Sequence, residues 1–348
     1  MVHDINQLGA DSATSRRKVL ALSGSAMAAG VAGCLGDDDG DDDDEEYPTG
    51  DIDVIIPFDT GTGFDTFVRG VIEFLPGHLP NEVDVIPDNQ GPAPEGTAAI
   101  YNAEPDGYEI GASMLLGMSV QELMLDAPFS IAEMTALPRI HADRAILAAN
   151  TDTPYETVDD LQTTDEDLRW AVVGGTDSHY QAVITADEMG IPADIVPYDG
   201  APDAIASTLR GETEITAFSA SSTPMADGLT QGDLRPVMIY NDGPLDYLPY
   251  TQELDIADTT HDLGYSELDI TSVQRVFFAP PDLPDDIHGV LEDALMDTME
   301  SDEMQEWADE DEGRFVDPAP SDVIADEIDM IHDLINEHED TIQEHLDD

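Results

Sequence analysis

Two segments of the chain share one order of elements: an apolar run, a turn containing two glycines, and an amphipathic run. The first is "VIIPFDTGTGFDTFVRG" (Val54–Gly70) and the second is "WAVVGGTDSHYQAVITADEMG" (Trp170–Gly190). From Asp51 onward, short apolar runs alternate with helical segments in the same way. This alternation predicts an α/β fold with mainly parallel sheets and helices on both faces. The length of 348 residues suits two domains of this kind.

The expected strands are short apolar runs bounded by Gly, Pro or Asp. They are Ile52–Pro57, Val83–Pro87, Tyr108–Ser113, Ala145–Asn150, Arg169–Val173, Asp194–Pro197, Glu214–Phe218, Arg235–Ile239 and Val273–Ala279. The expected helices between them include Asp65–Phe74, Tyr180–Glu188 and Pro202–Arg210. The tail from Pro320 to Leu346 carries Ile324, Ile328, Ile331 and Ile335 at helical spacing, which predicts core packing.

The charge of the chain limits its partners. Eleven basic and 78 acidic residues give a formal net charge of −67, yet 41% of the residues are hydrophobic. This composition predicts a globular core under an acidic surface, and it excludes nucleic acid as a partner on electrostatic grounds. Such a surface repels itself at ordinary ionic strength, whereas multimolar salt shortens the Debye length to about 3 Å or less. We therefore expect adaptation to a saline medium.

The N-terminal residues have the pattern of an export signal. Ser15–Leu20 reads "SRRKVL", which is typical of a twin-arginine motif, and a weakly apolar stretch follows from Val19 to Ala32. Val31–Cys34 is similar to a lipobox. Residues 1–33 are predicted to be a signal peptide, and Cys34 is predicted to be lipidated. Because Cys34 is the only cysteine, disulfides and thiolate metal sites are excluded.

Residues 34–50, "CLGDDDGDDDDEEYPTG", are rich in aspartate and glycine. The tract lacks the glutamate at position twelve and the flanking helices of a calcium loop. A charged, self-repelling tether fits it better. The sequence thus predicts an exported protein that a lipid anchor holds on the outer face of the cell membrane.

The glycine turns do not fit the common catalytic motifs. After Gly61 and Gly63, Thr66 occupies the third glycine position of a dinucleotide fingerprint, and the chain has no Gly-Lys-Ser/Thr sequence. An extracellular hydrolase using Ser178 and His179 is a distant alternative, because neighbours in sequence do not face one another as a relay requires. His141, His179 and His261 have no metal-ligand spacing, and aromatic residues make up only 6% of the chain. We therefore expect no enzyme, no cofactor and no metal.

Backbone N–H groups are the recognition chemistry that remains. A helix N-terminus offers unpaired donors and a partial positive charge, which bind a carboxylate as readily as a phosphate. Turns of this kind gather outside the carboxyl ends of parallel strands. Two of them facing each other would form a cleft that closes on a small anion.

At these residues the sequence resembles the TctC or Bug family, the substrate-binding proteins of tripartite tricarboxylate transporters. The segment "IPFDTGTGFD" (56–65) is similar to the family's first loop, Val-Pro-Phe-x-x-Gly-Gly-Gly-x-Asp. Three further segments resemble the family in order: "DNQGPAPEGTAAIYNAEPDGYEIG" (88–111), "DIVPYDGAPDAIASTLRGETEI" (194–215) and "VFFAPPDLPDDI" (276–287). The similarity extends from about Asp51 to the end of the chain.

The resemblance implies a two-lobed Venus-flytrap fold of the periplasmic-binding-protein type. Residues 51–147 and 270–348 would form lobe 1, residues 148–269 would form lobe 2, and the lobes would hinge near Ala145–Asn150 and Leu263–Ser272. The implied ligand is a small organic acid, such as a di- or tricarboxylate, whose carboxyl group is held by main-chain donors and ordered water. The implied partner is a membrane permease with a large and a small subunit.

The resemblance also implies which residues contact the ligand. In the first loop they are Phe58, Asp59, Thr60, Gly61, Thr62, Gly63 and Asp65. In the second loop they are Gly174, Gly175, Thr176, Asp177, Ser178 and His179. Additional contacts are implied at Ser113, Asp199, Ser219 and Ser221.

The sequence departs from the family pattern in the first loop. Asp59 replaces a small apolar residue, Thr62 replaces a glycine, and Phe64 replaces a small polar residue. Either Asp59 faces solvent, which we favour, or it meets a cation or a ligand ammonium group. The second loop is also shorter than in the family, so the resemblance does not identify the ligand. A sensor lobe that serves a signalling partner is an alternative to a transport receptor.

Overall fold

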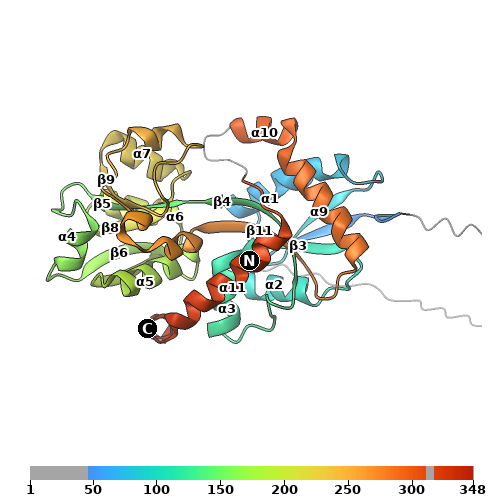
Figure 1. The fold of residues 1–348 in the computed structure, drawn as a ribbon, viewed down its shortest axis with the longest axis horizontal. Coiled ribbons are helices and arrows are strands. Elements are labelled where there is room, and N and C mark those ends of the chain that lie inside the picture. The colour runs from blue at the N-terminus through green and yellow to red at the C-terminus, as the bar shows by residue number, and fades with distance from the viewer. Residues whose placement is uncertain (1–45, 311–316, 348) are drawn as a thin grey trace, which may run out of the picture. The chain divides into compact units, whose positions relative to one another are not determined.

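The computed structural model describes residues 46–310 and 317–347. Contacts divide the chain into two units, Met1–Asp44 and Glu45–Asp348, and the second contains two β-sheets flanked by helices (Figure 1). The predicted signal peptide, Cys34 and nearly all of the predicted tether lie outside the described residues. In the described part of the chain, no helix is both long and apolar enough to cross a membrane.

The first sheet has five strands in the order β2-β1-β3-β11-β4. Their bounds are β1 Ile52–Ile56, β2 Val85–Asn89, β3 Glu109–Met114, β4 Thr135–Asp143 and β11 Val273–Ala279. β1 pairs in parallel with β2 and β3, whereas β11 pairs antiparallel with both β3 and β4. The first glycine loop follows the carboxyl end of β1.

The second sheet has six strands in the order β10-β9-β5-β8-β6-β7. Their bounds are β5 Ala145–Asn150, β6 Leu168–Val173, β7 Ala193–Tyr198, β8 Ile215–Ser219, β9 Leu234–Ile239 and β10 Asp258–Thr259. β6 pairs in parallel with β7 and β8, whereas β5 pairs antiparallel with β8 and β9. The second glycine loop follows β6.

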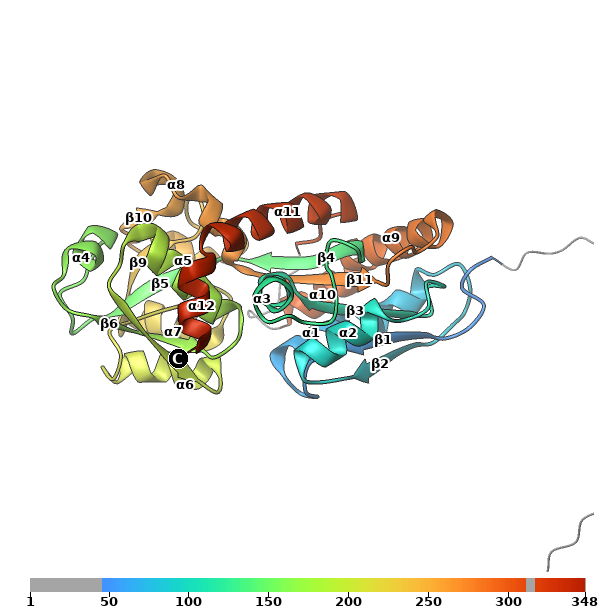
Figure 2. The same ribbon diagram turned by 90° about the horizontal axis from the view of Figure 1, so that it is seen from below.

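Helices connect the strands and cover the sheets (Figures 1 and 2). Their bounds are α1 Gly63–Phe74, α2 Ala93–Tyr101, α3 Leu115–Met124, α4 Val158–Thr163, α5 Asp177–Met189, α6 Ala201–Leu209, α7 Thr223–Gln231, α8 Thr260–Leu263, α9 Asp285–Glu300, α10 Asp302–Asp309, α11 Ser321–Glu337 and α12 Glu339–Asp347. Short 3₁₀ helices lie at η1 Leu75–Gly77, η2 Pro249–Glu253 and η3 Ser266–Thr271.

The two-sheet α/β fold predicted from the sequence is confirmed. The chain passes from the first sheet to the second at Arg144, between β4 and β5, and it returns at Ser272, before β11. Each antiparallel pair described above includes β5 or β11, the strands next to these two crossings. The predicted lobe boundaries at 147/148 and 269/270 remain a prediction, and β5, which contains the first boundary, pairs within the second sheet.

Some predicted element bounds were wrong. β4 was not expected, because its sequence "TALPRIHAD" mixes apolar residues with Pro, Arg, His and Asp; all of its residues from Leu137 onward are nevertheless buried. The two-residue strand β10 was not expected either. Helix α1 begins two residues before the predicted Asp65, because Thr62 caps it, and α5 begins three residues before the predicted Tyr180.

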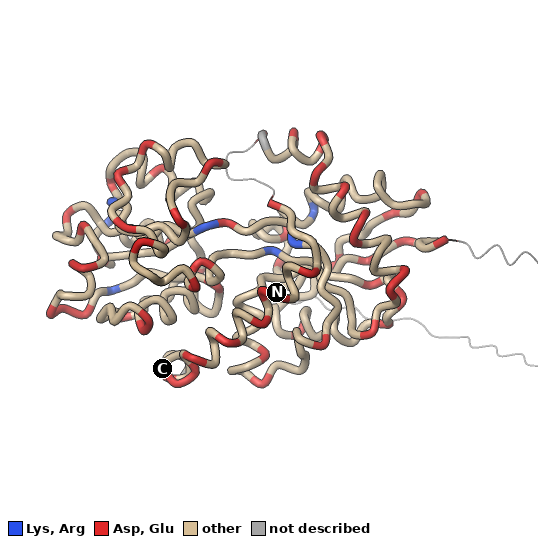
Figure 3. The backbone as a smooth tube through the Cα atoms, in the orientation of Figure 1, with Lys and Arg blue, Asp and Glu red and all other residues tan. Residues whose placement is uncertain are grey.

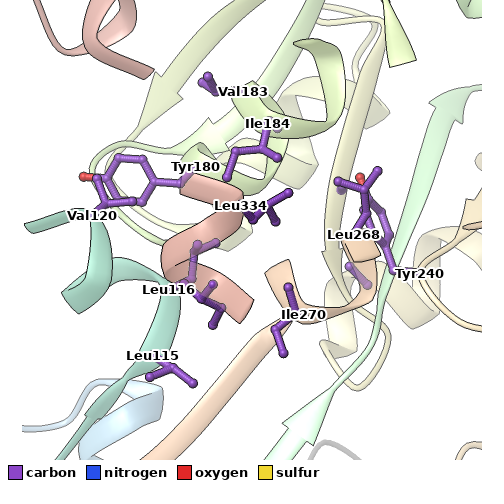
Figure 4. Close-up of a cluster of buried hydrophobic side chains, with 14 of the residues drawn as sticks. Leu115, Leu116, Val120, Tyr180, Val183, Ile184, Tyr240, Leu268, Ile270 and Leu334 are labelled. Atoms are coloured by element: carbon purple, nitrogen blue, oxygen red, sulfur yellow. The ribbon is translucent and has the colours of Figure 1, made fainter. Parts of the chain in front are cut away.

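An apolar cluster joins elements from both sheets (Figure 4). In this view Val120 of α3 lies beside Tyr180 of α5, and Leu334 of α11 lies between Leu116 of α3 and Ile184 of α5. The predicted stripe of Ile324, Ile328, Ile331 and Ile335 is buried in this cluster, so its core role is confirmed. α12 packs on both α3 and α5 (Figure 2). One edge of the contact between the two sheets is thus closed by apolar packing.

A candidate ligand cavity

A cavity of about 720 Å³ lies where the two glycine loops meet. Its walls include the starts of α1, α5, α6 and α7, each of which follows the carboxyl end of a strand. This is the position at which open α/β sheets bind ligands, and four helix N-termini offer positive potential there. A second cavity of about 630 Å³ lies beside β9 and the 151–157 loop, away from both glycine loops.

The structure brings together many of the residues that the resemblance implied. Those lining the cavity are Phe58, Gly61, Thr62, Gly63, Thr176, Asp177, Ser178, Asp199, Ser219 and Ser221. The others, Asp59, Thr60, Asp65, Ser113, Gly174, Gly175 and His179, are not among its lining residues. Ser113 is buried in β3, in register with Val276 of β11, whereas its neighbour Met114 lines the cavity.

The first loop is held by the side chain of Asp65. Gly61 has a φ of +86°, which a residue with a Cβ rarely adopts, and Thr62 caps α1 by accepting a hydrogen bond from the Asp65 N–H. The Asp65 carboxylate in turn accepts from Gly61 N at 2.7 Å, from Asn89 Nδ2 at 2.8 Å and from Arg69 Nε at 2.8 Å. Burial raises the pKa of this carboxyl, but the three hydrogen bonds outweigh burial and lower the pKa below its ordinary value. Asp65 therefore shapes the loop.

Asp59 points away from the cavity. Its side chain is exposed and lies beside Gly91, in the segment after β2. Its carbonyl oxygen accepts a hydrogen bond from Thr62 N at 3.3 Å, which closes the turn. The favoured interpretation of Asp59, a side chain that faces solvent, is confirmed.

Main-chain donors remain free at the start of α1. Within the described residues, the N–H groups of Gly63 and Phe64 donate no hydrogen bond to the protein, as expected at the first turn of a helix. Gly63 and Phe64 both line the cavity. A carboxylate in the cavity can accept hydrogen bonds from these donors.

The second loop has the same backbone turn with different side-chain contacts. Gly175 has a φ of +70°, and its N–H donates to His179 Nδ1 at 3.1 Å. Ser178 Oγ accepts from Val173 N at 3.0 Å and lies 3.1 Å from Thr176 Oγ1. Because His179 Nδ1 binds the loop backbone and its ring stacks on Tyr180, this geometry lends no support to a Ser178–His179 relay.

Asp177 is buried in the cavity wall at the start of α5. Its Oδ1 accepts a hydrogen bond from Gly117 N of α3 at 2.8 Å, whereas its buried Oδ2 has no partner among the described residues. Burial raises the pKa of this carboxyl to about 7, although the Gly117 hydrogen bond and the charge of Arg275 act in the opposite direction. The side chain is therefore a half-satisfied acid, only 2% exposed.

Arg275 of β11 brings a cation to the cavity wall. Its Nη1 donates to the imidazole of His141 on β4, and its Cζ lies 4.9 Å from the centroid of the Phe67 ring. The His141 ring stacks on Phe67 at 4.6 Å, and burial together with the charges of Arg275 and Arg139 holds its pKa well below the ordinary value, so the imidazole is neutral. Burial lowers the pKa of Arg275 to about 10, which leaves the guanidinium charged at neutral pH.

A second buried acid lies behind the hydroxyl groups of the cavity. Asp143, at the end of β4, accepts hydrogen bonds from the hydroxyl and the N–H of Ser221 and from Tyr247 Oη. Burial raises the pKa of Asp143, against the hydrogen bonds from Ser221. Ser221 is thereby oriented by a carboxylate that does not itself line the cavity.

The two walls of the cavity differ in character. The wall from the first sheet carries Phe58, Phe64, Phe67, Met114 and Trp307 around Arg275. The wall from the second sheet carries hydroxyl and acidic side chains, namely Thr176, Asp177, Ser178, Asp199, Ser219, Ser221, Ser222 and Thr223, with Phe218. Sequence reasoning missed Arg275, Phe67 and Trp307. An arginine inside an apolar strand, in a chain with so few basic residues, was the available signal for Arg275.

Within residues 46–310 and 317–347, no group of three or more His, Cys, Asp or Glu side chains is arranged to hold a metal ion.

Comparisons with known proteins show the family of the chain and its fold. The model of the tripartite tricarboxylate transporter family receptor (TctC) matches residues 82–345. A TctC solute-binding protein from Polaromonas has a similar structure, with 20% sequence identity, a TM-score of 0.70, and coverage of 84% of this chain and 99% of that one. No curated protein matches the sequence.

Two similar structures contain ligands. MatC from Rhodopseudomonas palustris, with bound malate, is 18% identical with a TM-score of 0.63, and the match covers 83% of this chain and 100% of that one. Rpa4515 from R. palustris, with adipate, is 16% identical with a TM-score of 0.64, covering 85% and 98%. At these identities the similarity shows the fold, whereas the family model covers most of the sequence. The chain belongs to the tripartite tricarboxylate transporter receptor family, whose members are extracytoplasmic solute-binding proteins.

Proposed function

We propose that this protein captures a small organic acid in the cavity between its two glycine loops and delivers it to the permease of a tripartite tricarboxylate-type transporter. The observation that carries the proposal is the cavity of about 720 Å³, which both loops line and which contains backbone donors and a guanidinium. The similar proteins with bound malate and adipate support a carboxylate ligand.

Capture requires the two walls of the cavity to close around the ligand, and it involves no covalent reaction. The N–H groups of Gly63 and Phe64 donate hydrogen bonds to one end of the ligand from the first sheet, while Ser178, Ser219 and Ser221 approach from the second sheet. The apolar cluster of α3, α5 and α11 holds the opposite edge together (Figure 4), so we place the hinge near Arg144 and Ser272, where the chain changes sheet. A bound ligand then stabilises the closed state by its contacts with both walls.

A thermal-shift screen in multimolar salt tests this proposal. The panel contains mono-, di- and tricarboxylates, amino acids and aromatic acids, with sugars and amines as negative controls. We expect at least one carboxylate to raise the melting temperature in a concentration-dependent way. If no carboxylate does so while the protein remains folded, the capture of an organic acid is rejected. Retention of the permease subunits on the immobilised, ligand-loaded protein separates transport from a sensor role.

We also propose that Cys34 carries the lipid anchor after removal of residues 1–33, and that the acidic tract 34–50 is a tether. The pattern "SRRKVL" and the small residues before Cys34 support this assignment. We expect the Cys34→Ala variant to be released into the medium or to stay as an unprocessed precursor, whereas wild-type protein stays with the membrane fraction. Equal membrane retention of both would contradict the anchor.

The acidic surface is proposed to be an adaptation to a saline medium. Acidic residues occur on nearly every described helix and loop, and basic residues are few (Figure 3). Because the repulsion acts over the whole surface, we expect dilution from multimolar to decimolar salt to unfold the protein. Far-UV circular dichroism that stays unchanged below decimolar salt would contradict this adaptation.

A further inference from the structure

Arg275 differs from the other arginines that the structure describes. Arg69, Arg139, Arg169 and Arg210 each form a salt bridge with a carboxylate. Arg144 and Arg235 donate to backbone carbonyl oxygens. Arg275 lines the cavity, and no carboxylate lies within salt-bridge distance of it among the described residues. Its Nε is buried without a hydrogen-bond partner.

The neighbours of Arg275 hold it in place without neutralising it. The His141 imidazole accepts a hydrogen bond in its neutral form, and the Phe67 ring lies under the guanidinium. The two acids whose charges act on Arg275, Asp143 and Asp177, accept hydrogen bonds from Ser221 and from Gly117 respectively. A cation in such surroundings is strongly stabilised by an anion that enters the cavity, because a charge taken from water needs a partner.

The charges around the cavity limit how many anionic groups a ligand can bring. The charged side chains among the lining residues are Arg275, Asp177 and Asp199. One carboxylate is balanced by Arg275. Above pH 7, where Asp177 is ionised, a second carboxylate would face the wall that carries Asp177 and Asp199, where like charges repel. A hydrogen-bond donor at that end of the ligand would instead find the hydroxyl oxygens and the unpartnered Oδ2 of Asp177.

The aromatic side chains of the cavity wall indicate which kind of group the ligand carries besides its carboxylate. The chain has nine Phe and two Trp, and five of these eleven residues line the cavity: Phe58, Phe64, Phe67, Phe218 and Trp307. Phe58 and Phe64 lie with their ring centroids 4.5 Å apart, and Trp307 meets Phe67 edge to face at 5.6 Å. The Phe and Trp residues of the chain are thus concentrated at this site, whereas none of its ten Tyr residues lines the cavity. Such a wall favours an apolar or aromatic group over a compact, fully charged acid.

We propose that the ligand is a monocarboxylate with an apolar body and an amino or hydroxyl group, and that its carboxylate pairs with Arg275 while its donor group faces Asp177. This inference rests on the proposed function, because it assigns the ligand class of the same cavity. It departs from a di- or tricarboxylate ligand. Arg275 then determines that a carboxylate binds, and Asp177 determines which carboxylates are preferred.

The test is calorimetric titration in multimolar salt at pH 8 with four acids of one skeleton. They are 3-phenylpropanoate and its 2-amino, 2-hydroxy and 2-carboxy derivatives, supplemented by malate and adipate. We expect the wild-type protein to bind the amino or the hydroxy acid at least tenfold more tightly than the unsubstituted acid and the dicarboxylates. This panel tests the ligand class on wild-type protein alone. A dicarboxylate that binds most tightly would overturn the assigned class and leave the proposed function standing.

Substitutions test the two named side chains. Arg275→Gln should weaken binding of every carboxylate at least tenfold, and Arg275→Lys should weaken it less, because lysine keeps the charge but loses the planar fork. Arg210→Gln is the control, since it makes the same charge change on an exposed side chain paired with Glu212. Asp177→Asn should weaken the amino and hydroxy acids and strengthen the dicarboxylates, because an amide N–H replaces the acceptor.

The possible failures are separable. If Arg275→Gln and Arg275→Lys both fold and bind within twofold of wild type, the role of Arg275 is wrong although carboxylate capture stands. If Asp177→Asn leaves the order of affinities unchanged, the role of Asp177 is wrong. If wild-type protein binds no acid at all, the proposed function fails together with this inference. Circular dichroism of each variant identifies any that does not fold, and Arg275→Lys then replaces Arg275→Gln as the decisive variant.

Discussion

The two glycine loops have nearly the same backbone, but the pKa values of their aspartates are shifted in opposite directions. In each, a strand leads into a glycine with positive φ and then into a helix, and an aspartate lies in the first turn. Asp65 of the first loop accepts three hydrogen bonds, and its pKa is lowered. Asp177 of the second loop accepts one hydrogen bond from another segment of the chain, and burial raises its pKa to about 7. The first acid therefore builds its loop, whereas the second keeps one buried carboxylate oxygen, Oδ2, without a hydrogen-bond partner among the described residues.

This difference shows how a shared motif acquires two roles. Of the three donors to Asp65, Gly61 N and Arg69 Nε come from the first loop and its own helix, and Asn89 reaches it because β2 lies next to β1 in the sheet. The second loop has α3 of the other sheet as its neighbour, and α3 supplies a single backbone N–H. Asp65 is thus satisfied by its own loop and helix together with a neighbouring strand, whereas Asp177 depends on one donor from another segment.

Replacing Asp65 should have the largest effect. Asp65→Ala leaves Gly61 N, Asn89 Nδ2 and the Arg69 guanidinium without their acceptor, so we expect a loss of about 3–5 kcal/mol in the free energy of unfolding. Denaturant titration in multimolar salt measures it. Asp59→Ala, in the same loop but exposed, is the matched control and should change stability by less than about 0.5 kcal/mol. Equal effects of the two substitutions would refute the structural role of Asp65.

The pH dependence of stability should separate Asp177 from Asp65. The pKa of Asp177 is about 7 in the folded protein, well above that of an unfolded aspartate, so the folded state holds its proton in a window where the unfolded state has lost it. The free energy of unfolding of the wild type, relative to Asp177→Asn, should therefore fall by about 2–4 kcal/mol as pH rises from 4 to 8.

The sign is reversed for Asp65, whose pKa is lowered by its hydrogen bonds. Its stabilising contribution is present above the ordinary pKa of an aspartate and is lost as the pH falls through the lowered value.

Denaturant titrations of the wild type and of Asp177→Asn from pH 4 to 8, without ligand and in multimolar salt, measure the pH dependence that Asp177 contributes. A difference that does not vary with pH would show that the Asp177 carboxyl titrates normally.

The smallest effects on stability are expected at the glycine with positive φ that each loop contains. Gly61→Ala and Gly175→Ala each place a Cβ on a residue with positive φ, and no atom lies within 4 Å of either Cβ position. Backbone strain alone then acts, and each substitution should cost about 1 kcal/mol of folding free energy. Thermal unfolding of the two variants side by side checks this. Costs that differ by more than about 1 kcal/mol would mean that the two turns are not equivalent.

Much of the fold was predictable from local patterns in the sequence. β1, β5 and β11 were predicted from short apolar runs, and the isoleucine stripe of α11 was predicted from its helical spacing. β4 was missed because Arg139, His141 and Asp143 are buried by partners from distant segments: Glu327 binds Arg139, Arg275 contacts His141, and Ser221 binds Asp143. Sequence periodicity does not report such pairings.

The part of the candidate site that is formed by the backbone of the two glycine loops was predictable from the sequence. Glycine turns before helices marked both loops, and most of their predicted residues line the cavity. The hydrogen bond from Asn89 to Asp65 depends on β2, and the position of Arg275 depends on the return of the chain into the first sheet at β11. These are tertiary relationships between segments far apart in sequence, so no local motif contains them.

The most direct test is a crystal structure of the protein with the tightest-binding acid of the panel. We expect one ligand in the cavity, with its carboxylate oxygens at hydrogen-bonding distance, about 2.7–3.0 Å, from the Arg275 guanidinium and from the N–H groups of Gly63 or Phe64. The second loop should contact the other end of the same molecule. A ligand bound beside Arg235 in the second cavity, or one in the main cavity that touches neither Arg275 nor the start of α1, would contradict it.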